Sequence, residues 1–75
     1  MTSRYQVALR DRVIVNLVAQ GMSNREIAEA IGVSYQTIRL RLTTIYARNE
    51  ISEGRGGKNR RELARRHRLG LIGQM

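Results

Sequence analysis

The sequence predicts an all-α fold of four helices, with a long Gly-rich loop before the last helix. Apolar residues recur at helical spacing between breaks that are marked by glycines. No six-residue window alternates apolar and polar residues cleanly enough to indicate a strand. The chain contains no proline that would interrupt a helix. We expect helices over about residues 7–20, 24–31, 35–49 and 60–69, within a single domain that covers residues 1–75.

The first expected helix carries a wide apolar stripe and ends at Gly21, which suits the left-handed conformation of a helix stop. Asp11 falls within the apolar sector, where a carboxylate needs a partner. Two arginines of the third helix, Arg41 and Arg48, lie on the flank that borders the core. We hypothesise that one of them forms an ion pair with Asp11. The stripe consists of Val7, Ile14, Val15, Leu17 and Val18.

The second expected helix opens with a capping box. The hydroxyl of Ser23 can accept a hydrogen bond from the amide of Glu26, whose carboxylate can reach back to the amide of Ser23. This helix is short and ends at Gly32. The third helix can begin almost at once, because Ser34 is a good N-cap residue. Two helices joined by a tight turn that contains glycine are the signature of a helix-turn-helix motif.

The last expected helix begins with a second capping-box pattern, formed by Asn59 and Glu62. The connection from Glu50 to Lys58 is long for so small a bundle, and its glycines indicate a flexible loop. One side of the helix holds Leu63, Ala64, His67 and Leu71. Arginines cover most of the rest, as a solvated face, a phosphate-contacting face or a site for an acidic partner: Arg60, Arg61, Arg65, Arg66 and Arg68.

The composition indicates a small basic binding module. Fourteen basic residues, 13 of them arginine, outnumber 6 acidic residues and give a formal net charge of +8. Arginine favours a polyanionic partner, because the guanidinium group matches phosphate oxygens in pairs. The chain has no cysteine and one histidine, so we expect no metal, no cofactor, no small-molecule ligand and no enzyme activity. No apolar run reaches 18 residues, so we expect no membrane partner and a cytoplasmic location.

The helix-turn-helix pattern predicts double-stranded DNA as the partner. In such motifs the second helix enters the major groove, and its N-terminal residues reach base edges. The outward side of the third expected helix has no acid. On that side Arg39 can donate two hydrogen bonds to guanine, Gln36 can pair with adenine and Leu40 can contact a thymine methyl. The predicted base contacts are Gln36, Arg39, Leu40 and Thr43, and the predicted phosphate contacts are Ser23, Asn24, Ser34, Tyr35, Thr37, Thr44 and Arg48.

Residues 7–51 resemble the LuxR/GerE-type helix-turn-helix domain, the output domain of NarL/FixJ-type response regulators. The match runs from Asn16 to Arg39, and its most specific parts are Gly-Met-Ser-Asn-Arg-Glu-Ile-Ala over residues 21–28 and Ser-x-x-Thr over residues 34–37. The family pattern there is Ser-Asn-Lys-Glu-Ile-Ala, a Gly, and then Ser-x-x-Thr-Val. The resemblance implies a four-helix architecture in which helix three lies in the groove and helix four often mediates dimerisation.

The chain departs from that family pattern in three places. Arg41 stands where the family usually has His. The family has a Lys-Leu-Gly-Val turn where this chain has Arg-Asn-Glu-Ile over residues 48–51, so the glycine is lost. About six residues, Glu53 to Lys58, are inserted before the last helix, which bears on where that helix lies.

We expect a stand-alone, sequence-specific transcription regulator of prokaryotic or phage origin that is associated with the nucleoid and binds DNA as a homodimer. The predicted dimer or partner contacts are Leu63, His67 and Leu71. One alternative is a small adaptor or anti-regulator that binds another regulatory protein and binds DNA only weakly. Another is an architectural or RNA-binding basic protein, which would leave the turn and both caps unexplained. A membrane-active helix over residues 59–72 is disfavoured by its narrow apolar stripe.

Overall fold

The computed structural model describes residues 4–52 and 57–71, with side chains for residues 10–52 and 57–71. It contains four helices: α1 (Arg4–Ala19), α2 (Asn24–Ile31), α3 (Tyr35–Arg48) and α4 (Lys58–Arg68). No strand occurs in these two ranges, so the all-α prediction is confirmed. Part of the predicted Gly-rich loop, residues 53–56, lies outside the described residues, as does the side chain of Val7. None of the described helices is long and apolar enough to cross a bilayer.

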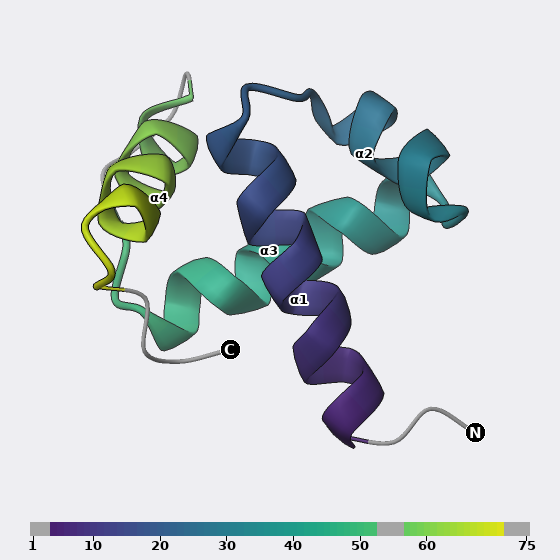
Figure 1. Ribbon diagram of the computed structural model, residues 1–75, viewed down its shortest axis with the longest axis horizontal. Helices are drawn as coiled ribbons and strands as arrows, with labels where there is room; N and C mark the ends of the chain where they lie inside the picture. The colour runs from purple at the N-terminus through teal and green to yellow at the C-terminus, as the bar shows by residue number, and fades with distance from the viewer. Residues whose placement is uncertain (1–3, 53–56, 72–75) are drawn as a thin grey trace.

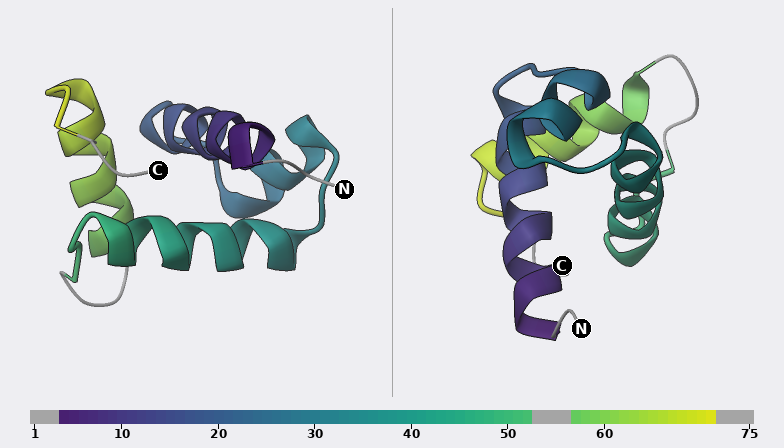
Figure 2. Two further views of the ribbon diagram at one scale, coloured as in Figure 1. Left: turned by 90° about the horizontal axis from the view of Figure 1, so that it is seen from below. Right: turned by 90° about the vertical axis from the view of Figure 1, so that its right-hand side faces the viewer.

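The first helix is the centre of the fold. It contacts each of the other three helices. Figure 1 shows α1 crossing α3, with α2 and α4 on opposite sides of the crossing. In the left view of Figure 2, α3 runs along one side of the molecule, and no other described helix lies over its outer side. The packing of the bundle therefore leaves one long side of α3 open.

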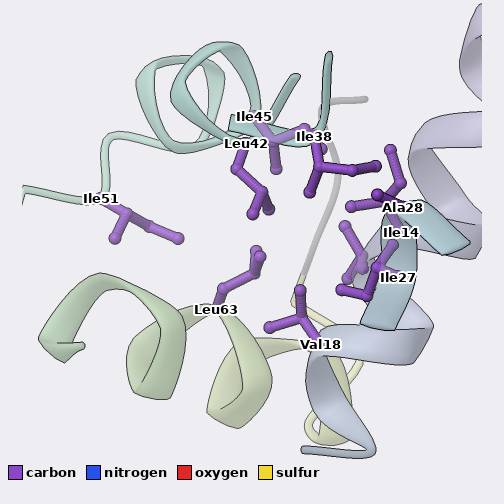
Figure 3. Packing of buried hydrophobic residues seen from close by; sticks show 10 residues of the cluster. Ile14, Val18, Ile27, Ala28, Ile38, Leu42, Ile45, Ile51 and Leu63 are labelled. Atoms are coloured by element: carbon purple, nitrogen blue, oxygen red, sulfur yellow. The ribbon is translucent and has the colours of Figure 1, made fainter. Parts of the chain in front are cut away.

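Aliphatic side chains from all four helices form one core (Figure 3). In that view Leu63 of α4 points toward Leu42 and Ile45 of α3. Leu63 is fully buried, so it stabilises the folded chain itself, and the expectation that it contacts a partner is corrected. The buried members of the core are Ile14, Val15, Val18, Ile27, Ala28, Ile38, Leu42, Ile45, Ile51 and Leu63.

A buried ion pair joins α1 to α3. Asp11 is fully buried, and its carboxylate accepts hydrogen bonds from Nε of Arg41 at 3.0 Å and from Nη2 at 2.6 Å. The hypothesis of an arginine partner is confirmed, and of its two candidates the partner is Arg41 rather than Arg48. The hydrogen bond to Asp11 raises the pKa of Arg41, while burial acts in the opposite direction. A bidentate pair fixes orientation as well as distance, so it also sets how α3 is rotated about its own axis.

The two predicted caps stand on either side of the turn. Oγ of Ser23 accepts a hydrogen bond from the amide of Glu26 at 3.1 Å, and the Glu26 carboxylate accepts one from the amide of Ser23 at 2.9 Å. These bonds lower the pKa of Glu26. Gly32 ends α2 with a φ of 75°, in the left-handed region that glycine enters without steric penalty. Oγ of Ser34, the N-cap of α3, then accepts a hydrogen bond from the amide of Thr37 at 3.1 Å.

The predicted capping box of α4 is wrong. The helix begins at Lys58, and its N-cap residue is Gly57, which makes no side-chain cap hydrogen bond. Glu62 pairs instead with the guanidinium groups of Arg65 at 2.7 Å and Arg66 at 3.4 Å, one turn further along. These bonds, with that of Arg65 the largest cause, lower the pKa of Glu62. Because the helix starts at Lys58, Asn59 lies inside its first turn rather than at the cap, and Glu62 is too far along the helix to complete a capping box.

Two arginines of α4 attach this helix to the rest of the chain. Nη1 of Arg66 donates to the carbonyl of Asn49 at 2.6 Å, at the C-terminal end of α3. Arg60 donates to the carbonyl of Met22 and to the side-chain oxygen of Asn24, at the beginning of α2. Cations are favourable at the carbonyl end of a helix dipole, which suits Arg66 in particular. Part of the predicted arginine face therefore holds the fold together.

The turn after α3 keeps a left-handed residue without glycine. Glu50 has a φ of 55°, at the position where the family that the sequence resembles has Gly. For a residue with a side chain this conformation costs roughly 1–2 kcal/mol. The next residue, Ile51, is buried in the core, and its amide donates to the carbonyl of Tyr46 at 2.9 Å. Burial and that hydrogen bond hold the turn in place although the glycine is lost.

Removing Arg41 from the Asp11–Arg41 pair should destabilise the protein more than removing Asp11. Arg41→Ala strands a fully buried carboxylate and should lower the free energy of unfolding by about 3–5 kcal/mol. Asp11→Ala should lower it by about 2–3 kcal/mol, because the Arg41 side chain is 26% exposed and can turn to water. Urea denaturation followed by circular dichroism measures both changes.

The other candidate partner, Arg48, supplies a matched control for this prediction. Its side chain is exposed, so Arg48→Ala should change the free energy of unfolding by less than about 0.5 kcal/mol. An Asp11→Ala protein as stable as the wild type, or an Arg48→Ala protein as unstable as Arg41→Ala, would contradict the assignment.

Acid should weaken the ion pairs of α4. Because the pKa of Glu62 is lowered in the folded state, this group stays ionised where the unfolded chain already binds a proton. Its stabilisation is complete above the unfolded pKa and is lost as the pH falls through the folded pKa. We expect Glu62→Gln to melt below the wild type at pH 7 and the two melting temperatures to converge as the pH falls from about 5 to about 3. Thermal melts of both proteins across this pH range test the prediction. A difference in melting temperature at about pH 3 that equals the difference at pH 7 would refute it. Glu26, with its pKa shifted in the same direction, contributes to both curves and leaves their difference unchanged.

Candidate nucleic-acid interface

The open side of α3 presents polar and small side chains over successive helical turns. Gln36, Arg39, Leu40, Thr43 and Ala47 are exposed, and Leu40 is 67% exposed. The buried residues of the same helix, Ile38, Leu42 and Ile45, lie on its other side. The helix contains no acidic residue from Tyr35 to Arg48. A surface of this kind can approach a polyanion without like-charge repulsion.

The hydrogen-bonding groups of this side are not equally available. The hydroxyl of Thr43 donates to the carbonyl of Arg39 at 3.0 Å, and that of Thr44 donates to the carbonyl of Leu40 at 3.2 Å. Each hydroxyl keeps lone pairs that can accept a hydrogen bond. A phosphate offers only acceptors, so Thr44 would have to exchange its internal bond to contact one. Thr43 can use its methyl group or a lone pair toward a base edge.

The N-terminal end of α3 carries three of the predicted phosphate contacts. Ser34 is the N-cap, and its hydroxyl lies 2.9 Å from that of Thr37. Of these two hydroxyls one donates to the other, so the pair retains one hydroxyl hydrogen for an outside acceptor. Tyr35 follows Ser34 and is 43% exposed. The structure thus brings Ser34, Tyr35 and Thr37 together at the first turn of the helix.

Arg25 of α2 adds a cation that the sequence analysis did not select. Its guanidinium carbon lies 5.7 Å from the centre of the Tyr35 ring, and that of Arg39 lies 6.0 Å from the same point. Both distances are in the range of a cation–π contact. The position of Arg25, two residues after the N-cap Ser23, was visible in the sequence, but its approach to Tyr35 depends on how the turn folds.

A hollow at the start of α2 gathers further predicted phosphate contacts. This open pocket of about 340 Å³ is lined by Ser23, Asn24, Arg25, Tyr35 and Arg60. The side-chain oxygen of Asn24 accepts a hydrogen bond from Arg60, so its amide nitrogen remains as a donor. Arg60 belongs to α4, and its arrival here could not be read from the sequence. The pocket combines two cations with amide and hydroxyl donors.

The remaining predicted phosphate contact, Arg48, lies at the other end of α3 and is exposed. Helical spacing puts Thr37, Thr44 and Arg48 along one edge of the open side, because they are seven and four residues apart. Tyr35 and Arg39, four residues apart, lie along the opposite edge. Predicted phosphate contacts therefore lie along both edges of the open side, and on one edge Tyr35 is next to the predicted base contact Arg39.

The acid-free side ends at a second hollow, near the C-terminus of α3. This open pocket has a volume of about 610 Å³ and is lined by Thr43, Tyr46, Ala47, Glu50, Ile51, Ser52 and Asn59. Burial raises the pKa of Tyr46, while the charge of Arg60 acts to lower it. Glu50 is exposed and would repel a phosphate here. In the described part of the chain, no three His, Cys, Asp or Glu side chains gather at this pocket or elsewhere.

The predicted dimer contacts separate in the structure. Leu63 is in the core, whereas His67 is half-buried and Leu71 is 60% exposed. Leu69, which the sequence analysis did not select, is 59% exposed beside them in the chain. The end of α4 thus presents two leucines to solvent, and neither belongs to the open side of α3.

Comparison with known proteins identifies the family of this domain. Residues 6–52 match the family described as Homeodomain-like domain, a match that covers more than half of the chain. No curated protein and no solved structure matches the chain. The matched range takes in most of α1 and all of α2, the turn and α3, and it ends before α4. The chain therefore belongs to the homeodomain-like family, whose members are helix-turn-helix domains of the DNA-binding class.

Proposed function

From this family membership we propose that the protein is a sequence-specific regulator of transcription that binds double-stranded DNA and reads the major groove with α3. The observation that carries the proposal is the open, acid-free side of α3, which no other described helix covers (Figure 2, left). In homeodomain-like and other helix-turn-helix proteins the corresponding helix lies in the major groove.

We assign base recognition to Gln36, Arg39, Leu40 and Thr43. All four are exposed on that side. Arg39 has the donors for the two acceptors of guanine, and Gln36 matches the acceptor and donor of adenine. Leu40 has no hydrogen-bonding group and suits the methyl of thymine. Because Thr43 already donates within the helix, it acts through its methyl group or as an acceptor.

We assign phosphate contacts to the two edges of this side and to the start of α2. They involve Ser23, Asn24, Ser34, Tyr35, Thr37, Thr44 and Arg48. Contacts of this kind position the protein and supply most of the affinity, whereas base contacts supply the specificity. The binding constant should then fall as the salt concentration rises. A plot of the logarithm of the binding constant against the logarithm of the salt concentration should have a slope of roughly −0.9 for each phosphate that Arg or Lys neutralises.

We further propose that the domain is of LuxR/GerE type and binds DNA as a homodimer. Three features support this type: a fourth helix packed on α1, the Ser-x-x-Thr start of α3, and the left-handed residue at Glu50 where that type has Gly. The dimer would use the exposed end of α4, with His67, Leu69 and Leu71. A second copy is the occupant we favour, because one recognition helix spans too few base pairs for a selective site. A cytoplasmic, nucleoid-associated protein of a prokaryote or phage fits this proposal.

Selection of bound fragments from a random duplex pool tests the function directly. We expect one sequence to be enriched, with two inverted half-sites spaced by about one helical turn if the dimer proposal is right. Sedimentation of the protein with the selected duplex then gives the number of copies bound. Binding that depends on salt but enriches no sequence would refute sequence-specific regulation. That outcome, together with a tightly held protein partner, would favour an adaptor that binds another regulator.

Arg39→Ala should weaken binding to the selected site by about 1–3 kcal/mol and flatten the preference at a single base position. Repeating the selection with the variant measures both effects. Arg68→Ala is the matched control, because it removes one exposed cation at the far end of α4. This control should weaken binding equally on every duplex, if it weakens it at all. If Arg39→Ala behaves in that way too, Arg39 contacts a phosphate and its assignment to a base is wrong.

A further inference from the structure

The ring of Tyr35 is the point at which the two helices of the motif meet through charged side chains. Tyr35 is the first residue of α3, Arg25 lies in the first turn of α2, and Arg39 lies one turn into α3. Both guanidinium carbons lie over this one ring, at 5.7 Å and 6.0 Å from its centre. Tyr35 and Arg25 also line two open hollows together, each of about 340 Å³.

The two cations gathered here carry charge that the folded chain does not neutralise. Among the described side chains, neither Arg25 nor Arg39 takes part in an ion pair. Like charges placed against one ring repel each other, and the negative face of the ring offsets only part of that repulsion. An anion that contacts both would remove the remainder. Each arginine also loses less conformational freedom on binding if the ring already restricts it.

We propose that Tyr35 is a positioning residue that acts through its aromatic ring, and that it couples a phosphate contact by Arg25 to base reading by Arg39. This inference rests on the proposed function and makes it more specific. It adds Arg25 to the DNA contacts, and it changes the role of Tyr35 from a hydroxyl donor to a support for two guanidinium groups. The phosphate held by Arg25 would lie beside the base read by Arg39, because both guanidinium groups lie against the same ring.

Two substitutions of Tyr35 separate the ring from its hydroxyl. Tyr35→Leu removes both, and Tyr35→Phe keeps the ring. We expect Tyr35→Leu to weaken binding to the selected duplex about three- to tenfold and to reduce the preference at the base that Arg39 reads. Tyr35→Phe should restore both to within about twofold of the wild type. Tyr35 is 43% exposed, and melting curves should show that both variants fold.

A double-mutant cycle measures the coupling itself. Arg25→Ala and Arg39→Ala should each weaken binding less in the Tyr35→Leu protein than in the wild type, by about threefold. Purely multiplicative losses would show that the ring couples nothing and would overturn the proposal. Tyr35→Phe binding as poorly as Tyr35→Leu would also overturn it, in favour of a hydroxyl contact. So would a Tyr35→Leu protein that binds like the wild type.

Nuclear magnetic resonance of the free protein distinguishes failure of this inference from failure of the proposed function. The ring current of Tyr35 should shift the side-chain δ-proton signals of Arg25 and Arg39 upfield, and Tyr35→Leu should abolish both shifts. If these shifts are absent, the ring contacts are refuted whatever the protein binds. If they are present but the wild type selects no DNA sequence, the proposed function fails and the DNA role of the ring fails with it.

Discussion

The bidentate pair between Asp11 and Arg41 is the constraint on which the rest of the structure depends. It joins residues that are 30 positions apart, one on the central helix and one on the helix with the open side. The apolar contacts of Ile38, Leu42 and Ile45 hold α3 against the core, but side chains of similar shape tolerate small rotations. A guanidinium bonded twice to a fully buried carboxylate does not tolerate such a rotation of α3, because the rotation would leave a buried charge without its partner. The direction in which Gln36, Leu40 and Thr43 point follows from that restriction.

The arginines of this chain divide between internal and external roles. Arg41, Arg60 and Arg66 bond to distant groups of the chain itself: the Asp11 carboxylate of α1, the Met22 carbonyl before α2 and the Asn49 carbonyl at the end of α3. Arg25 and Arg39 lie against an exposed ring at the edge of the open side. The formal charge of +8 therefore overstates the number of cations that can reach a polyanion. A small core explains the internal use, because a chain of this length buries only about 60% of its unfolded surface and needs other attachments between helices.

The fourth helix extends a domain whose family match ends before it. Residues 6–52 take in most of α1 and all of α2 and α3, and α4 adds Leu63 to the core that these helices form. Arg60 ties the beginning of α4 to the start of α2, while Arg66 ties its last turn to the end of α3. α4 thus bonds to both helices of the motif without covering the open side of α3. Its exposed end, with Leu69 and Leu71, remains available for contacts outside the domain.

Features that depend on neighbours within one helical turn could be read from the sequence alone. The caps at Ser23 and Ser34, the glycine stops and the side of α3 that carries no acid all follow from residue type and spacing of three or four positions. The pattern at Asn59 and Glu62 failed because α4 begins at Lys58, which places both residues inside the helix, where Glu62 pairs with Arg65 and Arg66. Contacts between distant segments were decided only by the tertiary structure. Spacing could narrow the partner of Asp11 to two arginines of one flank, but it could not choose between them. Spacing gave no sign that Arg60 bonds to Asn24 of α2, that Leu63 is buried in the core, or that the guanidinium group of Arg25 lies over the ring of Tyr35. These outcomes depend on how the helices cross, and that geometry exists only once the core has packed.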